Sequence, residues 1–425
     1  MIRESTRGRT SAFVRAAAVS ALVLPLAAAV AACGGAATAT KPTPPPVRIG
    51  AIYNLTGGQS ALDAPSLDGA RLAVDRINAR GGLMGRRVEL LERDGQTDTA
   101  AVGRAAASLV TAGVSAIVGL SDTDQVLAAA PIAASAGVPF VTSGATSPRL
   151  PEQVPTWLFL ACFGDNAQAA ASAQYAAEEL GARTAVVFYD QEMEYTRLLA
   201  KYFRESFHTQ GGTIVASRKL SGVGGGGNGG EDGDGGSGEP EEDGNHAAGW
   251  LDRTPEAAEA DVLFVAAGPQ DAARIVRKLR AAGYHQPIMG GDSFDSESLT
   301  AAAEATGGDV YYTTHAAVGM RSANSAVRRF DASFLATYGR PPQNAFACLG
   351  YDAVGLVAAA VAHADSVKPA KVRDALQATR HYRGVTGTLS YDGTDRVPSK
   401  KVTVVRVGGR PDVVAQFTPD YVPHP

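Results

Sequence analysis

Two short apolar segments that end in small polar residues stand out in the hydrophobic pattern of this chain. The segment AIVGLSDTD occupies residues 116–124, and VPFVTSGATSP occupies residues 138–148. Apolar segments bounded in this way are typical of buried parallel strands. The Ala-rich residues 125–136 between them are long enough for a helix. The pattern predicts a strand, a helix and a second strand, with hydroxyl groups at the strand carboxyl ends, where open α/β sheets bind their ligands.

The same alternation of strands and helices continues on both sides of this unit. Apolar residues spaced 3-4-3 from Leu67 to Ile77 predict a helix that Ser66 caps and that Gly81-Gly82 ends. Residues 157–162 are predicted to form a short apolar crossing, after which a second series begins. The other predicted strands are 47–53, 87–93, 184–189, 213–219, 261–267, 287–290, 309–314, 387–391 and 401–407, and the other predicted helices are 99–112, 166–180, 195–207, 255–260, 269–282, 296–305, 325–338, 345–364 and 368–378. This order is typical of an α/β protein with two doubly wound lobes.

A Gly-rich, acidic segment, residues 221–249, interrupts the second series. Because it has almost no apolar residues, we expect it to be a disordered insertion. Its GVGGGG sequence at 222–227 formally matches GxGxxG, but no helix follows, so the match is compositional. Weak calcium binding by its acidic side chains is a lesser alternative to a solvated loop.

The N-terminus is predicted to be a targeting segment rather than part of the fold. Four arginines precede an apolar stretch of small residues, 16–32, which ends at Cys33 and is followed by a Pro/Thr-rich stretch. This resembles a bacterial lipoprotein signal, with residues 1–32 removed, Cys33 lipidated and residues 33–46 acting as a tether. The alternatives are a plain secretory peptide and a single membrane anchor. The expected location is the extracytoplasmic face of the cell membrane, with a lipid anchor.

Composition and motifs argue against several other functions. The formal net charge is −4 and no long basic run occurs outside the N-terminus, so a nucleic-acid partner is not expected. The sequence contains no CxxC, GxSxG, HExxH or GxxxxGK(S/T), and the first strand is not followed by a dinucleotide-binding fingerprint. We therefore expect neither an enzyme nor a metal or cofactor site.

Several motifs, taken with their order and spacing, point to a known family. They are NLTG at 54–57, GARLA at 69–73, INARGG at 77–82, VG at 118–119, VP at 138–139 with SGATSP at 143–148, the stretch from Asp190 to Tyr195, GGD at 290–292 and YDA at 351–353. From about residue 47 to residue 407 the chain resembles the periplasmic branched-chain amino acid binding family, the type I solute-binding proteins of ABC transporters. The resemblance implies two Rossmann-like lobes, 47–160 plus 316–390 and 162–315 plus 391–425, joined by a three-segment hinge.

The resemblance also implies how such a protein works. It implies a monomer that holds an amino acid or related amide between its lobes by hinge closure, of which periplasmic binding proteins are a standard example. The implied partner is an ABC transporter permease. A module that senses its ligand and signals to a membrane receptor is the alternative, because the same pair of closing lobes serves both purposes.

An amino-acid ligand needs hydrogen-bond donors for its carboxylate. Thr123 and Thr146 offer hydroxyl groups at the two strand ends. The backbone N–H groups of residues 144–146 and of the helix that starts near Thr123 add donors that favour an anion. By resemblance, Thr123, Gly144, Ala145 and Thr146 form the carboxylate clamp. The structural alternatives are that Thr123 caps the helix and that Thr146 caps a turn.

The ammonium group and the side chain of the ligand need an acceptor and a wall. Asp292 follows a strand and two glycines and, by resemblance, accepts from the ammonium group. Tyr195 matches a tyrosine that closes over the ligand, and Leu62 and Phe294 are expected to line the wall. The alternatives are that Asp292 caps the next helix and that Tyr195 is a core residue. Because Leu62 and Ala267 stand where aromatic residues are common in the family, the identity of the ligand stays open.

Besides Cys33, the sequence contains two cysteines. Cys162 lies at the first crossing and Cys348 at the start of the 345–364 helix, which the resemblance places near the hinge. We expect them to pair, because exported proteins often contain disulfides. Two buried thiols are the alternative.

Overall fold

The computed structural model describes residues 44–425, except for residues 221–253, 321 and 392–394. The predicted signal peptide, the lipidation site Cys33, most of the tether and the 221–249 insertion therefore lie outside the described residues. Residues 44–425 form one compact unit, within which the strands build two separate main sheets. The lobe boundaries expected from the sequence stay a prediction.

The first sheet contains the two strands that dominate the hydrophobic pattern. Its five parallel strands lie in the order β2-β1-β3-β4-β5. They are β1 Val47–Tyr53, β2 Val88–Asp94, β3 Ile117–Gly119, β4 Phe140–Thr142 and β5 Leu158–Leu160. Gly119 of β3 lies beside Thr142 of β4, so the loops that follow both strands leave the same edge of the sheet. The segment predicted as a crossing instead contains the edge strand β5, because three residues carry no periodicity that distinguishes a strand from a crossing.

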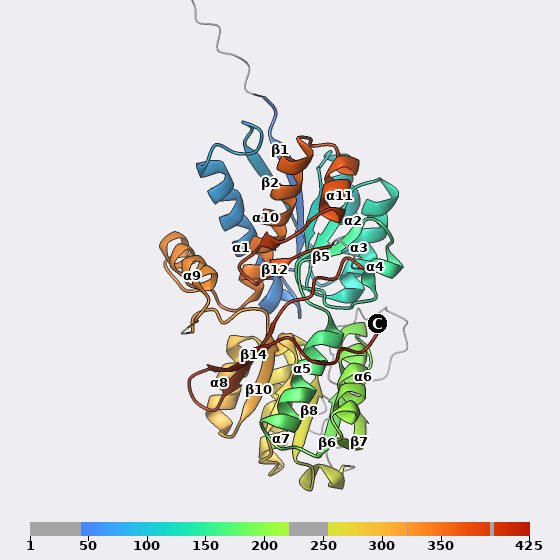
Figure 1. The fold of residues 1–425 in the computed structure, drawn as a ribbon, viewed down its shortest axis with the longest axis vertical. Coiled ribbons are helices and arrows are strands. Elements are labelled where there is room, and N and C mark those ends of the chain that lie inside the picture. Colours follow the sequence, from blue (N-terminus) through green and yellow to red (C-terminus); the bar gives the residue numbers. More distant parts are fainter. Residues whose placement is uncertain (1–43, 221–253, 321, 392–394) are drawn as a thin grey trace, which may run out of the picture. The chain divides into compact units, whose positions relative to one another are not determined.

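Among the described residues, seven helices belong to this sheet, and we call the sheet with its helices the first lobe. They are α1 Ser60–Ala79, α2 Thr99–Thr111, α3 Thr123–Ser135, α4 Leu150–Gln153, α9 Ser325–Tyr338, α10 Phe346–Ala364 and α11 Pro369–Gln377. Helices α1 and α10 pack side by side (Figure 1). A Cβ atom at Gly69 of α1 would lie 1.7 Å from the carbonyl oxygen of Ala347, so only glycine permits this contact. Helix α10 is long and apolar enough to cross a membrane, but it is mostly buried as the core helix of this lobe.

The start of α1 differs from the prediction. The helix begins directly after Gln59, and Ser66 lies buried inside it, so the predicted cap at Ser66 is wrong. Pro65 within the helix has no N–H group to donate to the carbonyl oxygen of Ala61. The side chain of Asn344 donates to that oxygen instead, at 2.9 Å. Asn344, which is distant in sequence, therefore replaces the helical hydrogen bond that Pro65 cannot make.

The second sheet has seven strands in the order β14-β13-β10-β9-β8-β6-β7, and β13 pairs antiparallel with both β10 and β14. The strands are β6 Thr184–Tyr189, β7 Thr213–Lys219, β8 Val262–Ala266, β9 Ile288–Gly290, β10 Val310–Thr314, β13 Val402–Val407 and β14 Asp412–Phe417. The helices are α5 Asp165–Glu178, α6 Glu194–Thr209, α7 Pro269–Ala281 and α8 Glu297–Thr306, with the 3₁₀ turns η1 Pro255–Ala258 and η2 Asp292–Phe294. We call these elements the second lobe. A ribbon of β11 Tyr382–Arg383 and β12 Thr388–Leu389 lies apart from both main sheets.

Each main sheet is buried on both faces. Along β1, Ile49 packs into the cluster that includes α1 and α10, whereas Ile52 packs into the cluster that includes α2 and α3. In the second lobe, Phe188 of β6 packs towards α7 and α8, and Val187 packs towards α5 and α6. Strands buried on both faces are nearly continuous in apolar residues, which is the pattern seen in the sequence. The predicted fold class, α/β with two doubly wound lobes, is confirmed.

Three chain segments pass between the lobes: after β5, after β10 and before β13. The third segment is bonded to the first. The Lys400 ammonium donates to the carbonyl oxygen of Ala161 at 2.8 Å, and the Tyr391 hydroxyl donates to that of Leu160 at 2.6 Å. These bonds hold the crossing segments together beside the carboxyl ends of the strands.

Candidate functional site

A small cavity lies where loops of both lobes meet. It is lined by Gln59, Leu62, Ser121, Asp122, Met193, Tyr195, Pro269, Asp292, Ser293 and Phe346. Leu62, Tyr195 and Asp292 were predicted from the sequence to contact a ligand. Ser121 and Asp122 come from the loop after β3 in the first lobe, and Asp292 comes from η2 after β9 in the second. The cavity therefore takes its walls from strand carboxyl ends of both sheets, as an open α/β architecture predicts.

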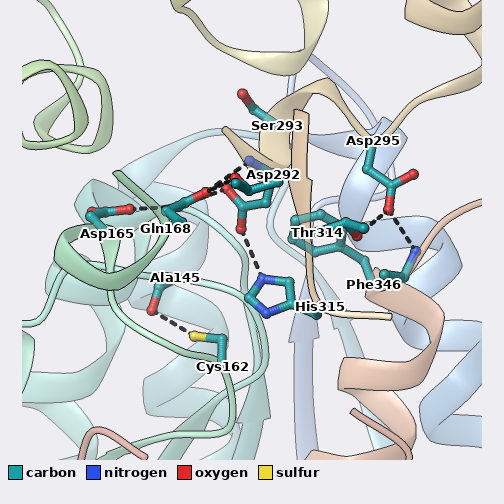
Figure 2. Close-up of polar contacts among 12 residues, drawn as sticks. Ala145, Cys162, Asp165, Gln168, Asp292, Ser293, Asp295, Thr314, His315 and Phe346 are labelled. Carbon is teal, nitrogen blue, oxygen red and sulfur yellow. Dashed lines mark hydrogen bonds and ion pairs between the residues drawn. The ribbon is translucent and has the colours of Figure 1, made fainter. Parts of the chain in front are cut away.

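Asp292 is the centre of a buried hydrogen-bond network (Figure 2). Its Oδ1 atom accepts from the Tyr195 hydroxyl at 3.0 Å and from Gln168 Nε2 at 3.1 Å. Its Oδ2 atom lies 2.9 Å from His315 Nε2. The side-chain oxygen of Gln168, Oε1, in turn accepts from the backbone N–H of Asp292 and from the Thr313 hydroxyl. A carboxylate can accept about four hydrogen bonds, so three donors leave room for roughly one more.

His315 supports Asp292 without neutralising it. Its side chain is fully buried and stacks on Phe163, with 3.8 Å between the ring centroids. Burial lowers the pKa of His315, and this effect outweighs the opposing influence of Asp292. The imidazole is therefore neutral at physiological pH, and its Nε2–H group donates to the carboxylate.

A second carboxyl group, that of Asp165 in the first turn of α5, lies on the other side of Gln168 from Asp292 (Figure 2). Its Oδ1 atom accepts from Gln168 Nε2 at 3.0 Å. Burial raises the pKa of Asp165 to about 8, and the neighbouring Asp292 raises it further. Burial and the two neighbouring carboxyl groups, Asp292 before Asp165, also raise the pKa of Tyr195 well above its usual value, so that its hydroxyl remains a donor. The second-lobe side of the cavity is thus rich in carboxyl groups.

On the first-lobe side, Asp122 caps α3. Its Oδ1 atom accepts from the backbone N–H of Gln125 at 3.0 Å. Thr123 is the first residue of the helix, so the alternative in which Thr123 is the cap is wrong. Sequence reasoning missed Ser121 and Asp122 as cavity residues. The spacing from Asp122 to Gln125 matches a capping box and could have identified Asp122 as the cap.

The loop after β4 uses its own backbone donors. The N–H groups of Ser143 and Gly144 donate to carbonyl oxygens of the β3 loop, and that of Ala145 donates to the Thr142 hydroxyl at 3.0 Å. Thr146 is buried, and its carbonyl oxygen accepts from the Asp165 N–H at 2.7 Å. Gly144, Ala145 and Thr146 are not among the residues that line the cavity.

Two other predicted site residues lie in the apolar core around the cavity. Phe294 is fully buried and belongs to the cluster that packs against α7 and α8. A Cβ atom at Gly290 would lie 2.6 Å from the Phe294 ring, so the ring covers the end of β9. Leu62 packs into the first-lobe cluster and also lines the cavity. Asp292 does not cap α8, whose N-cap is Ser296.

The expected disulfide is not present in the structure, in which Cys162 and Cys348 are free, buried thiols. The Cys162 thiol points towards the carbonyl oxygen of Ala145, at 3.2 Å, and the two cysteines belong to different core clusters. Burial raises the pKa of both thiols, so neither forms a thiolate readily. The expected pairing is therefore wrong, and the alternative of two buried thiols is confirmed.

The fold and this cavity together define a class of protein. Two doubly wound lobes present their strand carboxyl ends to one small polar cavity, and three chain segments connect the lobes. The part of the chain that the structure describes holds no cluster of three or more metal-ligating side chains. Such an architecture is that of a protein that holds a small solute between two lobes.

Comparisons with known proteins agree with this class. The family model described as periplasmic binding protein matches residues 46–225 and 253–411. Leu/Ile/Val-binding protein BraC3 of Rhizobium johnstonii is 24% identical over 362 residues, 85% of this chain and 91% of the relative. The chain belongs to the periplasmic binding protein family.

Solved structures support the same placement. The branched-chain amino acid transporter substrate-binding protein LivJ of Streptococcus pneumoniae, in complex with isoleucine, is 28% identical with a TM-score of 0.74, over 89% of this chain and 100% of that one. The leucine-binding protein LivK of Thermotoga maritima is 26% identical with a TM-score of 0.75, over 88% and 99% of the two chains.

Proposed function

We propose that this protein captures a small amine-bearing solute, an amino acid or related amide, between its lobes and delivers it to an ABC importer. The observation that carries the proposal is Asp292, which lines the cavity and accepts three internal hydrogen bonds, with capacity for about one more. An ammonium group is the natural fourth donor.

Hydrogen bonds between the lobes support a closing mechanism. The Glu194 N–H at the start of α6 donates to Asp124 of α3 at 3.1 Å, and the Ala345 N–H before α10 donates to Asp295 at 3.0 Å. Separation of the lobes would break both bonds. A ligand that contacts residues of both lobes would add to the same set of contacts and shift the equilibrium towards closure. Lipidation at Cys33 would keep the protein beside its membrane partner.

The test is a binding panel on the purified mature protein. Thermal-shift measurements followed by calorimetry would compare amino acids, their amides, urea and short peptides. We expect at least one small amine-bearing solute to raise the melting temperature and to bind with no turnover, because a ligand that binds only the folded state stabilises it. If no solute in the panel stabilises the protein, the proposal is wrong.

A further inference from the structure

Carboxyl groups line both walls of the cavity. Asp122 lines it from the first lobe and Asp292 from the second. Behind them lie two more fully buried carboxyl groups, those of Asp63 in α1 and Asp165 in α5. Burial raises the pKa of Asp63 to about 6 and that of Asp122 to about 7, and Asp124 adds to the effect on Asp122. Burial therefore disfavours the charged forms of Asp63 and Asp122.

Nothing in the cavity lining supplies a positive charge: its ten residues include no Lys, Arg or His. The nearest imidazole, that of His315, is neutral and already bonded to Asp292. Lys400 is buried, and its ammonium donates to the Ala161 carbonyl oxygen and to the Thr386 hydroxyl. Within the described residues, the protein thus provides no cation that would hold the carboxylate of a ligand.

Three of the backbone donors that would serve a carboxylate are also in use. Those of Ser143, Gly144 and Ala145 are bonded within the two loops. The N-terminus of α3, where a helix favours an anion, already has the carboxylate of Asp122 as its cap. A ligand carboxylate at this position would meet a side chain of like charge.

Unpartnered polar atoms gather at the same corner, and two of the four, Asp63 Oδ1 and Gln125 Oε1, are acceptors that need a donor. In the described part of the chain, Ser121 Oγ, which belongs to a cavity-lining residue, has no hydrogen-bond partner. The same is true of Asp63 Oδ1, Thr123 Oγ1 and Gln125 Oε1 around the start of α3. Ser121 is close enough to lower the pKa of Asp63, although the two groups lack good hydrogen-bond geometry. Buried acceptors without donors are costly, so a donor-rich ligand would be favoured here.

We propose that the cavity selects a cationic amine that lacks a free carboxylate, and that Asp122 is the residue that disfavours the carboxylate. This inference rests on the proposed function and narrows its ligand class. An amino-acid amide or a simple primary amine keeps the ammonium group for Asp292 and removes the anion that Asp122 would repel.

Matched ligand pairs test the inference. Calorimetry at pH 7.5 would compare alanine with alaninamide, and leucine with leucinamide and 3-methylbutan-1-amine. We expect the carboxylate-free member of at least one pair to bind about tenfold more tightly or better. If the amino acid binds as tightly as its amide or more tightly in each pair that binds, this inference is overturned while the proposed function stands. If no member of either set binds, this inference is overturned, and the wider panel decides the proposed function.

The Asp122→Asn variant tests the residue. Asparagine is also a favoured N-cap, so α3 keeps its start while the cavity loses the charge. The matched control is Asp98→Asn, because Asp98 caps α2 in the same way, by accepting from the Ala101 N–H, and does not line the cavity. We expect Asp122→Asn to reduce the preference for the amide over the amino acid by about tenfold, and Asp98→Asn to leave it unchanged. An unchanged preference in Asp122→Asn, with a melting temperature like that of the control, contradicts the assignment.

Discussion

Replacement of Asp292 by asparagine separates its role in binding from its role in the fold. The variant keeps the shape of the side chain and removes its charge. The asparagine carbonyl oxygen can still accept from Tyr195 and Gln168, which both donate to Oδ1 in the native protein. The new amide group would face His315 Nε2, which must change tautomer in order to accept. One of three internal bonds therefore rearranges, and we expect a loss of about 1–3 kcal/mol in the free energy of unfolding.

The substitution is also expected to weaken ligand binding. A hydrogen bond from an ammonium group to a carboxylate contributes about 1.5–3 kcal/mol, which corresponds to about 10–150-fold in the dissociation constant. An amide oxygen would offer only a neutral acceptor in its place. Asp292→Asn should therefore raise the dissociation constant of the solute that stabilises the native protein by about tenfold or more, as measured by calorimetry. Urea unfolding of the variant should still show a cooperative transition.

The control is a carboxylate with the same burial and the same number of donors at another place. Asp352 is fully buried and accepts from the Val385 N–H and from the N–H and hydroxyl groups of Thr386, outside the ligand cavity. Asp352→Asn should lower stability by a similar amount and leave the affinity unchanged. If both variants lose affinity equally, or if Asp292→Asn binds like the native protein, the role of Asp292 as the ammonium acceptor is refuted.

Two further predictions concern stability. The pKa of Asp165 is raised to about 8, so the folded state retains a proton that the unfolded state releases near pH 4, and stability should fall by up to about 1.4 kcal/mol per pH unit between pH 5 and 8. Asp165→Asn should flatten this slope in urea unfolding, and an equal slope in the variant would refute the linkage. A Cβ atom at Gly350 would lie 1.8 Å from the Ser66 carbonyl oxygen, so Gly350→Ala should lower the free energy of unfolding by about 1–3 kcal/mol. Gly103→Ala, whose Cβ atom would meet nothing closer than 3.5 Å, should stabilise α2 by about 0.5–1 kcal/mol, and thermal unfolding of the pair checks both expectations.

The elements that could be predicted from the sequence are those whose signal is local. The strands β3 and β4 and the helix α3 between them follow from apolar segments and turn residues, and they occur where expected. The start of α1 could not be predicted, because Pro65 is tolerated only when Asn344 bonds to the carbonyl oxygen that the proline leaves free. Strand β5 was missed for a related reason, since its three residues become a strand only beside β4.

The candidate site divides in the same way. Tyr195 and Asp292 follow strand ends of the second lobe, and this position, together with the family resemblance, predicted them at the site; both line the cavity. Phe294 follows the same strand, yet its ring covers Gly290 and joins the core. Position after a strand brings a residue to the correct edge of the sheet, but the direction of its side chain depends on packing that no short pattern encodes.

The first-lobe loops show that the residues near a site are easier to predict from sequence than the hydrogen-bond donors that remain free for a ligand. Their sequence shows hydroxyl and N–H groups, but it does not show which of these groups are already bonded to each other. In the structure, the Thr142 hydroxyl accepts from the Ala145 N–H, and the carboxylate of Asp122 occupies the N-terminus of α3. Several donors of these loops are therefore already bonded within the protein. The N-terminus of α3, which is the most favourable position for an anion, already holds the Asp122 carboxylate. The same capping interaction that starts the helix thus argues that the ligand brings positive charge to this wall of the cavity rather than negative charge.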